Sequence, residues 1–377
     1  MQQFKFVGAA LSAALLVAAC GGGSDDDQAA VVKFSSMVSF GDSLSDVGTY
    51  KVGTVAALGG GLYTVNGIAG AIGAVPTPSK NWTELIAAQA GLPAPCPAQT
   101  GLDGAPAQGF SVPVANHLGC YGYAQGGSRV TNPVGPGNKL LGGVNATLGQ
   151  LTVPVVTQIA QHLAAAGGSF KGNELVTVMA GGNDVFINLA TITPAITSLV
   201  TGGMSVAAAT AQASTAAVTE MGKAGAELAA YTKAEIVGKG AKYVVMVNLP
   251  DVSKTPFAYS QDAVTQGLIN TMVVTFNTQL QNGLAGTPGI VIVDAYSDSR
   301  NQAANPTAYG LSNVTVPACD LSATANPLAS SLVCTSKNVV PGDVSQYLFS
   351  DTVHLTPYGY KLVAQLVAKN LVQVGWL

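Results

Sequence analysis

Four short apolar runs separated by long helical stretches limit the folds that are open to this chain. The runs cover residues 31–40, 175–180, 242–248 and 289–294, and each is rich in β-branched side chains. Runs of this length without polar alternation are typical of strands that are buried on both faces. Because helical stretches separate and follow the runs, the pattern predicts a central parallel sheet between two layers of helices, an α/β/α sandwich of three layers.

The segments between and after these runs have the composition of helices. We expect helices at residues 82–90, 151–166, about 205–237, 262–285 and 358–373. Three further stretches are rich in Gly, Pro and Asn and are predicted to be long loops, at residues 51–79, 93–149 and 297–345. Loops of this length in a folded domain are usually functional or disordered.

Charge and hydropathy exclude some kinds of partner. Charged residues make up 9% of the 377 residues and the net charge is −3, so there is no electrostatic reason to expect nucleic acid as a partner. The mean hydropathy is +0.37. We nevertheless expect no membrane-spanning helix after the N-terminus, and a surface that is neutral and polar as in many secreted proteins.

The N-terminus has the pattern of an export signal. Lys5 precedes an apolar run over residues 7–19 that ends in small residues before Cys20. This end resembles the bacterial lipobox, in which the cysteine becomes the lipidated first residue. An ordinary signal peptide with an incidental cysteine is the alternative.

The sequence after Cys20 is rich in Gly, Ser and Asp, as expected for a flexible tether. We therefore predict a signal peptide over residues 1–19, a lipidated Cys20 with a tether over residues 20–33, and one folded domain over residues 34–377. The protein is expected in the cell envelope, held to a membrane by its lipid anchor, or secreted.

Four cysteines remain when Cys20 is set aside, namely Cys96, Cys120, Cys319 and Cys334. An even number in an oxidising compartment predicts two disulfides, for which three pairings exist. The pairs Cys96–Cys120 and Cys319–Cys334 are favoured because each would close one Gly- and Pro-rich loop. We expect these two loops to form walls of the substrate site. The cysteine spacings match no zinc pattern, so a metal site is not expected.

Two distant segments carry residues suited to nucleophilic catalysis. Ser43 follows the first apolar run, in Gly41-Asp42-Ser43-Leu44, and His354 lies three residues after Asp351 near the other end of the chain. Ester hydrolysis by serine needs a base to take the hydroxyl proton and an acid to orient that base. Taken singly, Ser43 could be a helix N-cap and Asp351–His354 a surface pair before a helix.

Two glycine-rich segments offer hydrogen-bond donors for an oxyanion. Asn183 ends another apolar run, in Gly181-Gly182-Asn183-Asp184, and could donate from its side chain. The segment 123–128 could donate a backbone N–H at Gly127, or at Gly126. Either segment could also be only a turn, because Gly-Gly and Asn-Asp are common in turns.

Together the four segments resemble the blocks of the GDSL, or SGNH, hydrolase family. Residues 41–46 match the block that names the family, residues 123–128 its glycine block, residues 181–184 its G-x-N-D block and residues 351–354 its closing D-x-x-H. The resemblance covers about residue 34 to the C-terminus. The secreted lipase-like branch is the most similar, because it shares the segment Asn248-Leu249-Pro250-Asp251.

This resemblance implies a fold, a site and a reaction. The fold would be the flavodoxin-like sandwich of the family. Ser43 would be the nucleophile, His354 the base and Asp351 the orienting acid, with an oxyanion hole made by the Ser43 and Gly127 N–H groups and the Asn183 side chain. Acyl esters would be hydrolysed through an acyl-enzyme, as in an esterase or lipase, without metal or organic cofactor.

Two other functions stay open at this stage. The same residues could remove acetyl groups from a polysaccharide, or the chain could be a surface binding module that has lost turnover. His117 and His162 are expected to be structural, as are Asp46 and Asp184. Tyr121, Tyr123 and Trp82 could line an acyl pocket or belong to the core.

Overall fold

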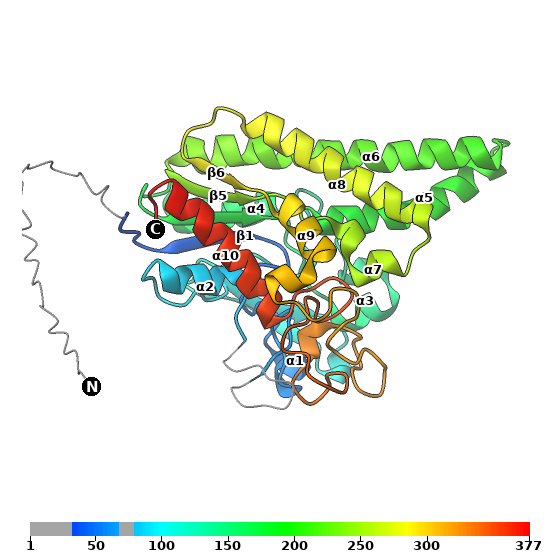
Figure 1. Cartoon of the computed structure of the whole chain (residues 1–377), viewed down its shortest axis with the longest axis horizontal. Coiled ribbons are helices and arrows are strands. Elements are labelled where there is room, and N and C mark those ends of the chain that lie inside the picture. The colour runs from blue at the N-terminus through cyan, green and yellow to red at the C-terminus, as the bar shows by residue number, and fades with distance from the viewer. Residues whose placement is uncertain (1–31, 68–78) are drawn as a thin grey trace, which may run out of the picture.

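A four-stranded parallel sheet forms the centre of the molecule. The computed structural model describes residues 32–67 and 79–377 (Figure 1). The strands are β1 (Met37–Gly41), β4 (Leu175–Met179), β5 (Tyr243–Val247) and β6 (Ile290–Val293), and they pair in the order β1-β4-β5-β6. The four predicted strands are confirmed, although the first begins at Met37.

Helices cover both faces of this sheet. On one face, strand residues such as Phe40 and Met246 share a core with α4 (Val155–Ala165), α6 (Val206–Tyr231) and α8 (Ala263–Leu284). On the other face, α2 (Trp82–Gln89) and α10 (Pro357–Gln373) pack over residues such as Met179 and Val247. Figure 1 shows α6 and α8 above the strands and α2 below them. Successive residues of one strand enter opposite cores, which explains why the strand runs are apolar throughout. The predicted three-layer α/β/α sandwich is confirmed.

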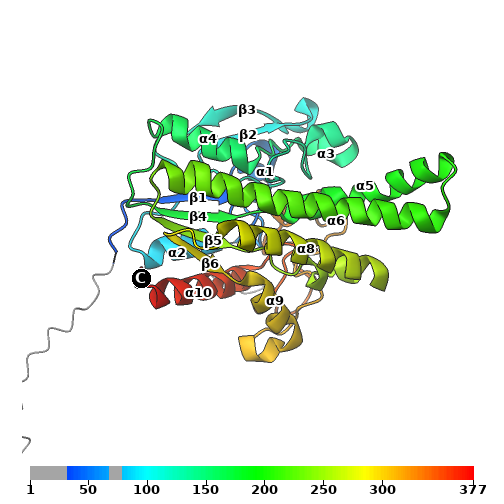
Figure 2. The same ribbon diagram turned by 90° about the horizontal axis from the view of Figure 1, so that it is seen from above.

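Several elements were not expected from the sequence. The longest are α5 (Gly182–Thr201), α9 (Ala295–Ala304) and a hairpin of β2 (Gln99–Asp103) and β3 (Ser111–Asn116). Figure 2 shows this hairpin beside α4, away from the parallel strands. The shorter helices are α1 (Gly53–Ala57), α3 (Gly143–Leu148) and α7 (Pro256–Tyr259). The Gly-Gly-Asn-Asp start and Pro194 inside α5 are turn and breaker signals, and they hide this helix from a propensity argument.

Helix α5 is the segment that bears on the expectation of no membrane-spanning helix after the N-terminus. Among the residues that the structure describes, it is the helix whose length and composition would allow a span. It begins at the carboxyl end of β4, and Figures 1 and 2 show it beside α6, both extending beyond the sheet. Core helices of soluble proteins can have the same length and apolar composition, so these two properties assign no membrane role to α5.

Both favoured disulfides are present. Cys96 is bonded to Cys120, and Cys319 is bonded to Cys334. The signal peptide over residues 1–19, the lipidation of Cys20 and nearly all of the tether fall outside the described residues, so they stay predictions.

Candidate active site

Ser43 lies immediately beyond the carboxyl end of β1, at a sharply defined turn. Gly41 has a φ of +150°, and a Cβ atom there would clash with the Met179 carbonyl oxygen on the neighbouring strand. Gln158 of α4 holds Gly41 from another side: its Oε1 accepts the Gly41 N–H at 2.9 Å, and its Nε2 donates to the Gly41 carbonyl at 2.8 Å. The backbone ahead of Ser43 is therefore fixed by both glycine and glutamine.

Ser43, His354 and Asp351 form one hydrogen-bonded chain. The Ser43 Oγ lies 2.8 Å from the His354 Nε2, and the His354 Nδ1 lies 2.8 Å from Oδ2 and 3.0 Å from Oδ1 of Asp351. An ionised carboxylate only accepts, so it assigns the ring proton to Nδ1 and leaves Nε2 as an acceptor. The Ser43 hydroxyl then donates to Nε2, which is the arrangement a general base needs.

The Asp351 carboxylate is held by backbone N–H groups as well as by the imidazole. Its Oδ1 accepts from the N–H groups of Val353 at 2.9 Å and His354 at 2.8 Å, and its Oδ2 accepts from the Ser331 N–H at 2.8 Å. Burial acts to raise the pKa of Asp351, but His354 and these hydrogen bonds outweigh it and hold the pKa well below its usual range. Asp351 is therefore ionised and fixed in orientation.

Tyr63 packs against the His354 ring, and nothing in the local sequence pointed to it. The two ring centroids are 4.7 Å apart with an interplanar angle of 35°. Tyr63 is buried, and burial raises the pKa of its hydroxyl well above the usual value. The imidazole is thus held by an aromatic face in addition to its two hydrogen bonds. Packing of this kind depends on the tertiary fold and leaves no local sequence pattern.

The glycine block reaches the site along the outer edge of β1. The Ser39 N–H donates to the Tyr121 carbonyl at 3.0 Å, and the Tyr123 N–H donates to the Ser39 carbonyl at 2.8 Å. The Gly126 N–H donates to Asp46 Oδ2 at 2.9 Å, so this group is already engaged. Of the two glycines considered from the sequence, Gly126 is therefore the less available as an oxyanion donor.

Gly127 and Asn183 are placed differently with respect to the site. Asn183 lines the pocket together with Ser43, and its Nδ2 donates to the Ser128 carbonyl at 2.8 Å, which leaves a second Nδ2 proton. Gly127 is next to Ser128 in the chain but is not among the residues that line the pocket. Its φ is +78°, and a Cβ atom would clash with the Pro136 carbonyl oxygen. Close backbone packing therefore requires glycine here in any case.

Two buried aspartates join the segments that carry the candidate residues. Asp46 accepts from the Gly48 and Thr49 N–H groups at 2.8 Å, and through its other oxygen from Gly126. Asp184 pairs with the Arg129 Nε at 2.8 Å and accepts from the N–H of the next residue, Val130, at 3.1 Å. Both aspartates are structural, as expected, since each ties one block to the glycine segment.

Asp42 places a second carboxyl group beside Ser43. It is buried, lines the pocket, and accepts from the Leu44 N–H at 3.0 Å. Burial raises the pKa of Asp42 to about 7, although the Leu44 hydrogen bond and His354 act in the opposite direction. Around neutral pH, Asp42 therefore carries a proton in a large share of molecules while Asp351 stays ionised. The two environments separate the protonation states of two nearby carboxyl groups.

An apolar pocket opens at Ser43 and His354. It has a volume of about 200 Å³ and crosses the carboxyl ends of all four parallel strands, from Ser43 after β1 to Ala295 after β6. The apolar lining includes Leu44, Met179, Phe186, Leu249, Val252, Ala295, Leu348, Phe349, Val353, Leu355, Val363 and Leu366. Polar lining residues include Asp251, Lys254 and Gln302. Ligands bind at this edge of parallel sheets in general.

The expectation that the disulfide-closed loops wall the substrate site is wrong in its main point. Of the predicted loop 93–149, only Pro136 lines the pocket, and of 297–345 the lining residues belong to α9. Within the described part of 51–79, no residue lines it. The sheet edge and α5, α9 and α10 supply most of the wall instead, because the strand ends already form an apolar floor.

The remaining histidines and aromatic residues lie away from this pocket. His162 is buried against the rings of Phe40, Tyr123 and Phe170, and burial lowers its pKa to about 4. Trp82 belongs to the core under α2 and α10. Of the three aromatic residues whose role the sequence left open, Trp82 and Tyr123 are part of the core, and Tyr121 packs against it. Gln158, a polar residue on the buried face of α4, was a local signal that could have been read as functional.

Comparison with known proteins adds a family match. A model described as GDSL-like lipase/acylhydrolase matches residues 37–367, a range that includes all four sequence blocks. Comparison with curated proteins gives no match. Among solved structures, the chain is similar to an alpha/beta hydrolase enzyme from the metagenome of Lake Arreo, Spain. Sequence identity is 14%, the match covers 92% of this chain and 97% of that chain, and the TM-score is 0.39.

Proposed function

The chain belongs to the GDSL-like lipase/acylhydrolase family, and from this premise we propose that it is a serine esterase that cleaves esters of hydrocarbon acids. One observation carries the proposal. The Ser43 hydroxyl, the His354 imidazole and the Asp351 carboxylate are joined by hydrogen bonds of 2.8 Å at the mouth of an apolar pocket. This is the geometry of an activated serine nucleophile.

The proposed reaction has two steps. The Ser43 Oγ attacks the ester carbonyl carbon while its proton passes to the His354 Nε2, and Asp351 stabilises the imidazolium that forms. The bond to the alcohol oxygen then breaks, and the proton on Nε2 goes to the leaving alcohol. In the second step, water gives a proton to Nε2 and attacks the acyl carbon. The acid leaves, and the proton returns to the Ser43 Oγ.

An oxyanion forms in both steps and needs donors that are already in place. We assign this role to the Ser43 and Gly127 N–H groups and to the second Nδ2 proton of Asn183. Asn183 is buried at the pocket wall, where the low dielectric strengthens a hydrogen bond to a developing negative charge.

Asn183→Ala tests this assignment. We expect kcat to fall by about 10²–10³-fold, because one oxyanion donor is lost. Asn188→Ala is a matched control, since Asn188 is also a buried asparagine of α5 but does not line the pocket. Steady-state kinetics on a short-chain aryl ester provide the measurement. Equal kcat values for the two variants would remove Asn183 from the oxyanion hole.

The shape of the pocket supports a hydrocarbon acyl group. Neighbouring strands lie about 4.8 Å apart, so the path from the end of β1 to the end of β6 is about 14 Å long. An extended chain advances about 3.3–3.6 Å for every three backbone atoms, so a path of this length takes about a dozen atoms. An acetyl group would leave most of this apolar surface uncovered, which argues against a polysaccharide deacetylase.

A panel of aryl esters with acyl chains of increasing length tests the substrate class. We expect kcat/KM to rise at least tenfold from acetyl toward medium-length chains, since each buried methylene contributes about 0.8 kcal/mol. Val363→Phe, which fills the pocket from α10, should reduce activity on the longer esters and spare the acetyl ester. Val372→Phe on the same helix is the control, because Val372 is 60% exposed.

The same panel separates the other functions. A preference for acetyl esters that Val363→Phe does not change would favour the deacetylase. No turnover of any ester, together with no labelling of Ser43 by a fluorophosphonate, would favour a non-catalytic binding module.

A further inference from the structure

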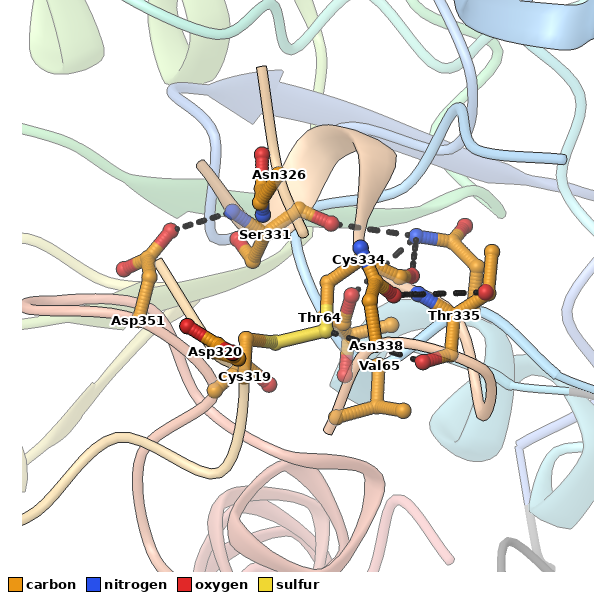
Figure 3. Close-up of a disulfide and its surroundings, with 12 residues drawn as sticks. Thr64, Val65, Cys319, Asp320, Asn326, Ser331, Cys334, Thr335, Asn338 and Asp351 are labelled. Atoms are coloured by element: carbon orange, nitrogen blue, oxygen red, sulfur yellow. Dashed lines mark hydrogen bonds between the residues drawn. A yellow bond between two sulfur atoms is a disulfide. The ribbon is translucent and has the colours of Figure 1, made fainter. Parts of the chain in front are cut away.

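The Cys319–Cys334 disulfide lies close to Asp351, the proposed orienting acid. Figure 3 shows Ser331, close to the disulfide, with its backbone N–H directed at the Asp351 carboxylate. That hydrogen bond is 2.8 Å long and buried. Ser331 precedes Cys334 by three residues, so the disulfide fixes the segment from which the donor comes.

The other half of the disulfide is bound to the turn that contains Asp351. The Cys319 N–H donates to the Ser350 carbonyl at 2.9 Å, and the Ser350 N–H donates to the His354 carbonyl at 2.7 Å. Cys319 is thus hydrogen-bonded to the backbone next to the Asp351–His354 turn, and Cys334 belongs to the segment that carries the Ser331 donor. The covalent bond therefore links the segment that carries the donor to the turn that carries the carboxylate.

Asn66 also holds the segment that contains Ser331 and Cys334, through hydrogen bonds to its backbone. Its Nδ2 donates to the Ser331 carbonyl at 3.1 Å and to the Cys334 carbonyl at 3.0 Å, and its own N–H donates to the Cys334 carbonyl at 2.8 Å. Asn66 is buried and lies three residues from Tyr63, which packs on the His354 ring. One assembly of loops therefore supports both the acid and the base.

Ser331 differs in kind from the other donors to Asp351. The N–H groups of Val353 and His354 belong to the same turn as Asp351 and move with it. Ser331 is 20 residues away in the chain and contacts Oδ2, the oxygen that also lies 2.8 Å from the His354 Nδ1. Ser331 therefore fixes the position of the Asp351 carboxylate relative to a segment outside its own turn.

We propose that the Cys319–Cys334 disulfide is a positioning element for catalysis, which holds the Ser331 N–H on Asp351 and thereby keeps the Asp351–His354 pair aligned with Ser43. This inference rests on the proposed esterase function. It differs from a general stabilising role, because it assigns a loss of turnover to one disulfide and not to the other.

The two disulfides provide a matched test. In Cys319→Ala/Cys334→Ala, we expect kcat to fall by about 10²-fold with KM within about twofold, because misplacing a catalytic group by about 1 Å has an effect of this size. In Cys96→Ala/Cys120→Ala, kcat should stay within about twofold of the wild type. The second disulfide has the larger sequence separation, 24 against 15 residues. Its removal is therefore expected to lower the melting temperature at least as much.

A second pair of variants isolates the hydrogen bond and remains informative if the cysteine variants do not fold. Ser331→Pro removes the N–H donor, and the extended backbone of Ser330 (φ −138°, ψ 146°) suits a residue before proline. Ser331→Ala retains the N–H and removes a buried hydroxyl without a partner among the described residues. We expect kcat of Ser331→Pro to be at least about tenfold below that of Ser331→Ala, by the same misplacement of Asp351.

Proton NMR of the His354 Nδ1–H gives a readout that does not depend on turnover. The resonance should change in Cys319→Ala/Cys334→Ala and in Ser331→Pro, and should be unchanged in Cys96→Ala/Cys120→Ala. Equal kcat values for the two disulfide variants, or an unchanged resonance in folded Ser331→Pro, would overturn the proposal. Failure of the esterase assignment itself would differ, because wild type and Ser43→Ala would then have equal turnover.

Discussion

Replacing Ser43 with alanine is expected to lower kcat for ester hydrolysis by about 10⁶-fold, the size of effect seen when a serine nucleophile is removed. The reason is chemical: among the described residues, Ser43 is the one whose side chain is hydrogen-bonded to the His354 Nε2. Background hydrolysis from binding and from the oxyanion donors would remain. Single-turnover kinetics on an aryl ester, at enzyme concentrations above that of the substrate, measure so large a loss.

Ser39→Ala is the control for this experiment. Ser39 lies on β1 four residues before Ser43, and its buried hydroxyl has no hydrogen-bond partner among the described residues. Its removal should therefore leave kcat nearly unchanged. Labelling by a fluorophosphonate should occur in the wild type and in Ser39→Ala and be absent in Ser43→Ala. Turnover of Ser43→Ala at the wild-type rate would refute the mechanism.

Asp351→Asn is expected to lower kcat by about 10⁴-fold, as when the acid of a serine triad is made neutral. An amide placed against the His354 Nδ1 can present N–H in place of an acceptor, which favours the ring tautomer that cannot take the Ser43 proton. The variant also has one side-chain oxygen to accept the N–H groups of Ser331, Val353 and His354. An unsatisfied buried donor destabilises the fold by about 1–3 kcal/mol.

The measurement for this variant combines kcat with the free energy of unfolding. Asp343→Asn is the matched control, because Asp343 is exposed and its carboxylate accepts a hydrogen bond from the Ser345 N–H within its own turn. A folded Asp351→Asn protein with kcat within about tenfold of the wild type would show that His354 does not need the carboxylate.

The sequence allowed the sheet and the four blocks to be predicted because both depend on short-range patterns. Each strand is a short β-branched run, and the blocks at residues 41–46 and 181–184 each follow a strand, so the parallel arrangement places these two at one edge. The disulfide pairing followed from proximity along the chain. By contrast, α5 was missed, because its Gly-Gly start and internal Pro194 are breaker signals that tertiary packing overrides.

The supports of the site were beyond sequence reasoning for a physical reason. Gln158, Tyr63 and Ser331 act on Gly41, His354 and Asp351, respectively, across separations of 20 to 291 residues along the chain. A side chain or an N–H that meets its partner at such a distance follows no local periodicity. The composition of the loops predicted that disulfide-closed loops form the walls of the pocket. In the structure, the Cys319–Cys334 disulfide lies close to Asp351 instead, and residues of α9 and α10 line the pocket.

The sequence alone therefore determined which groups can do the chemistry: a serine at a strand end, an Asp-x-x-His turn and a glycine-flanked asparagine, in an order typical of one family. Tertiary structure decided how those groups are held and what they can bind. It placed the Ser43 Oγ 2.8 Å from the His354 Nε2 and aligned the pocket with the strand ends. Reactivity is a property of side-chain type, which the sequence states directly, whereas alignment and pocket shape arise only when distant segments pack together.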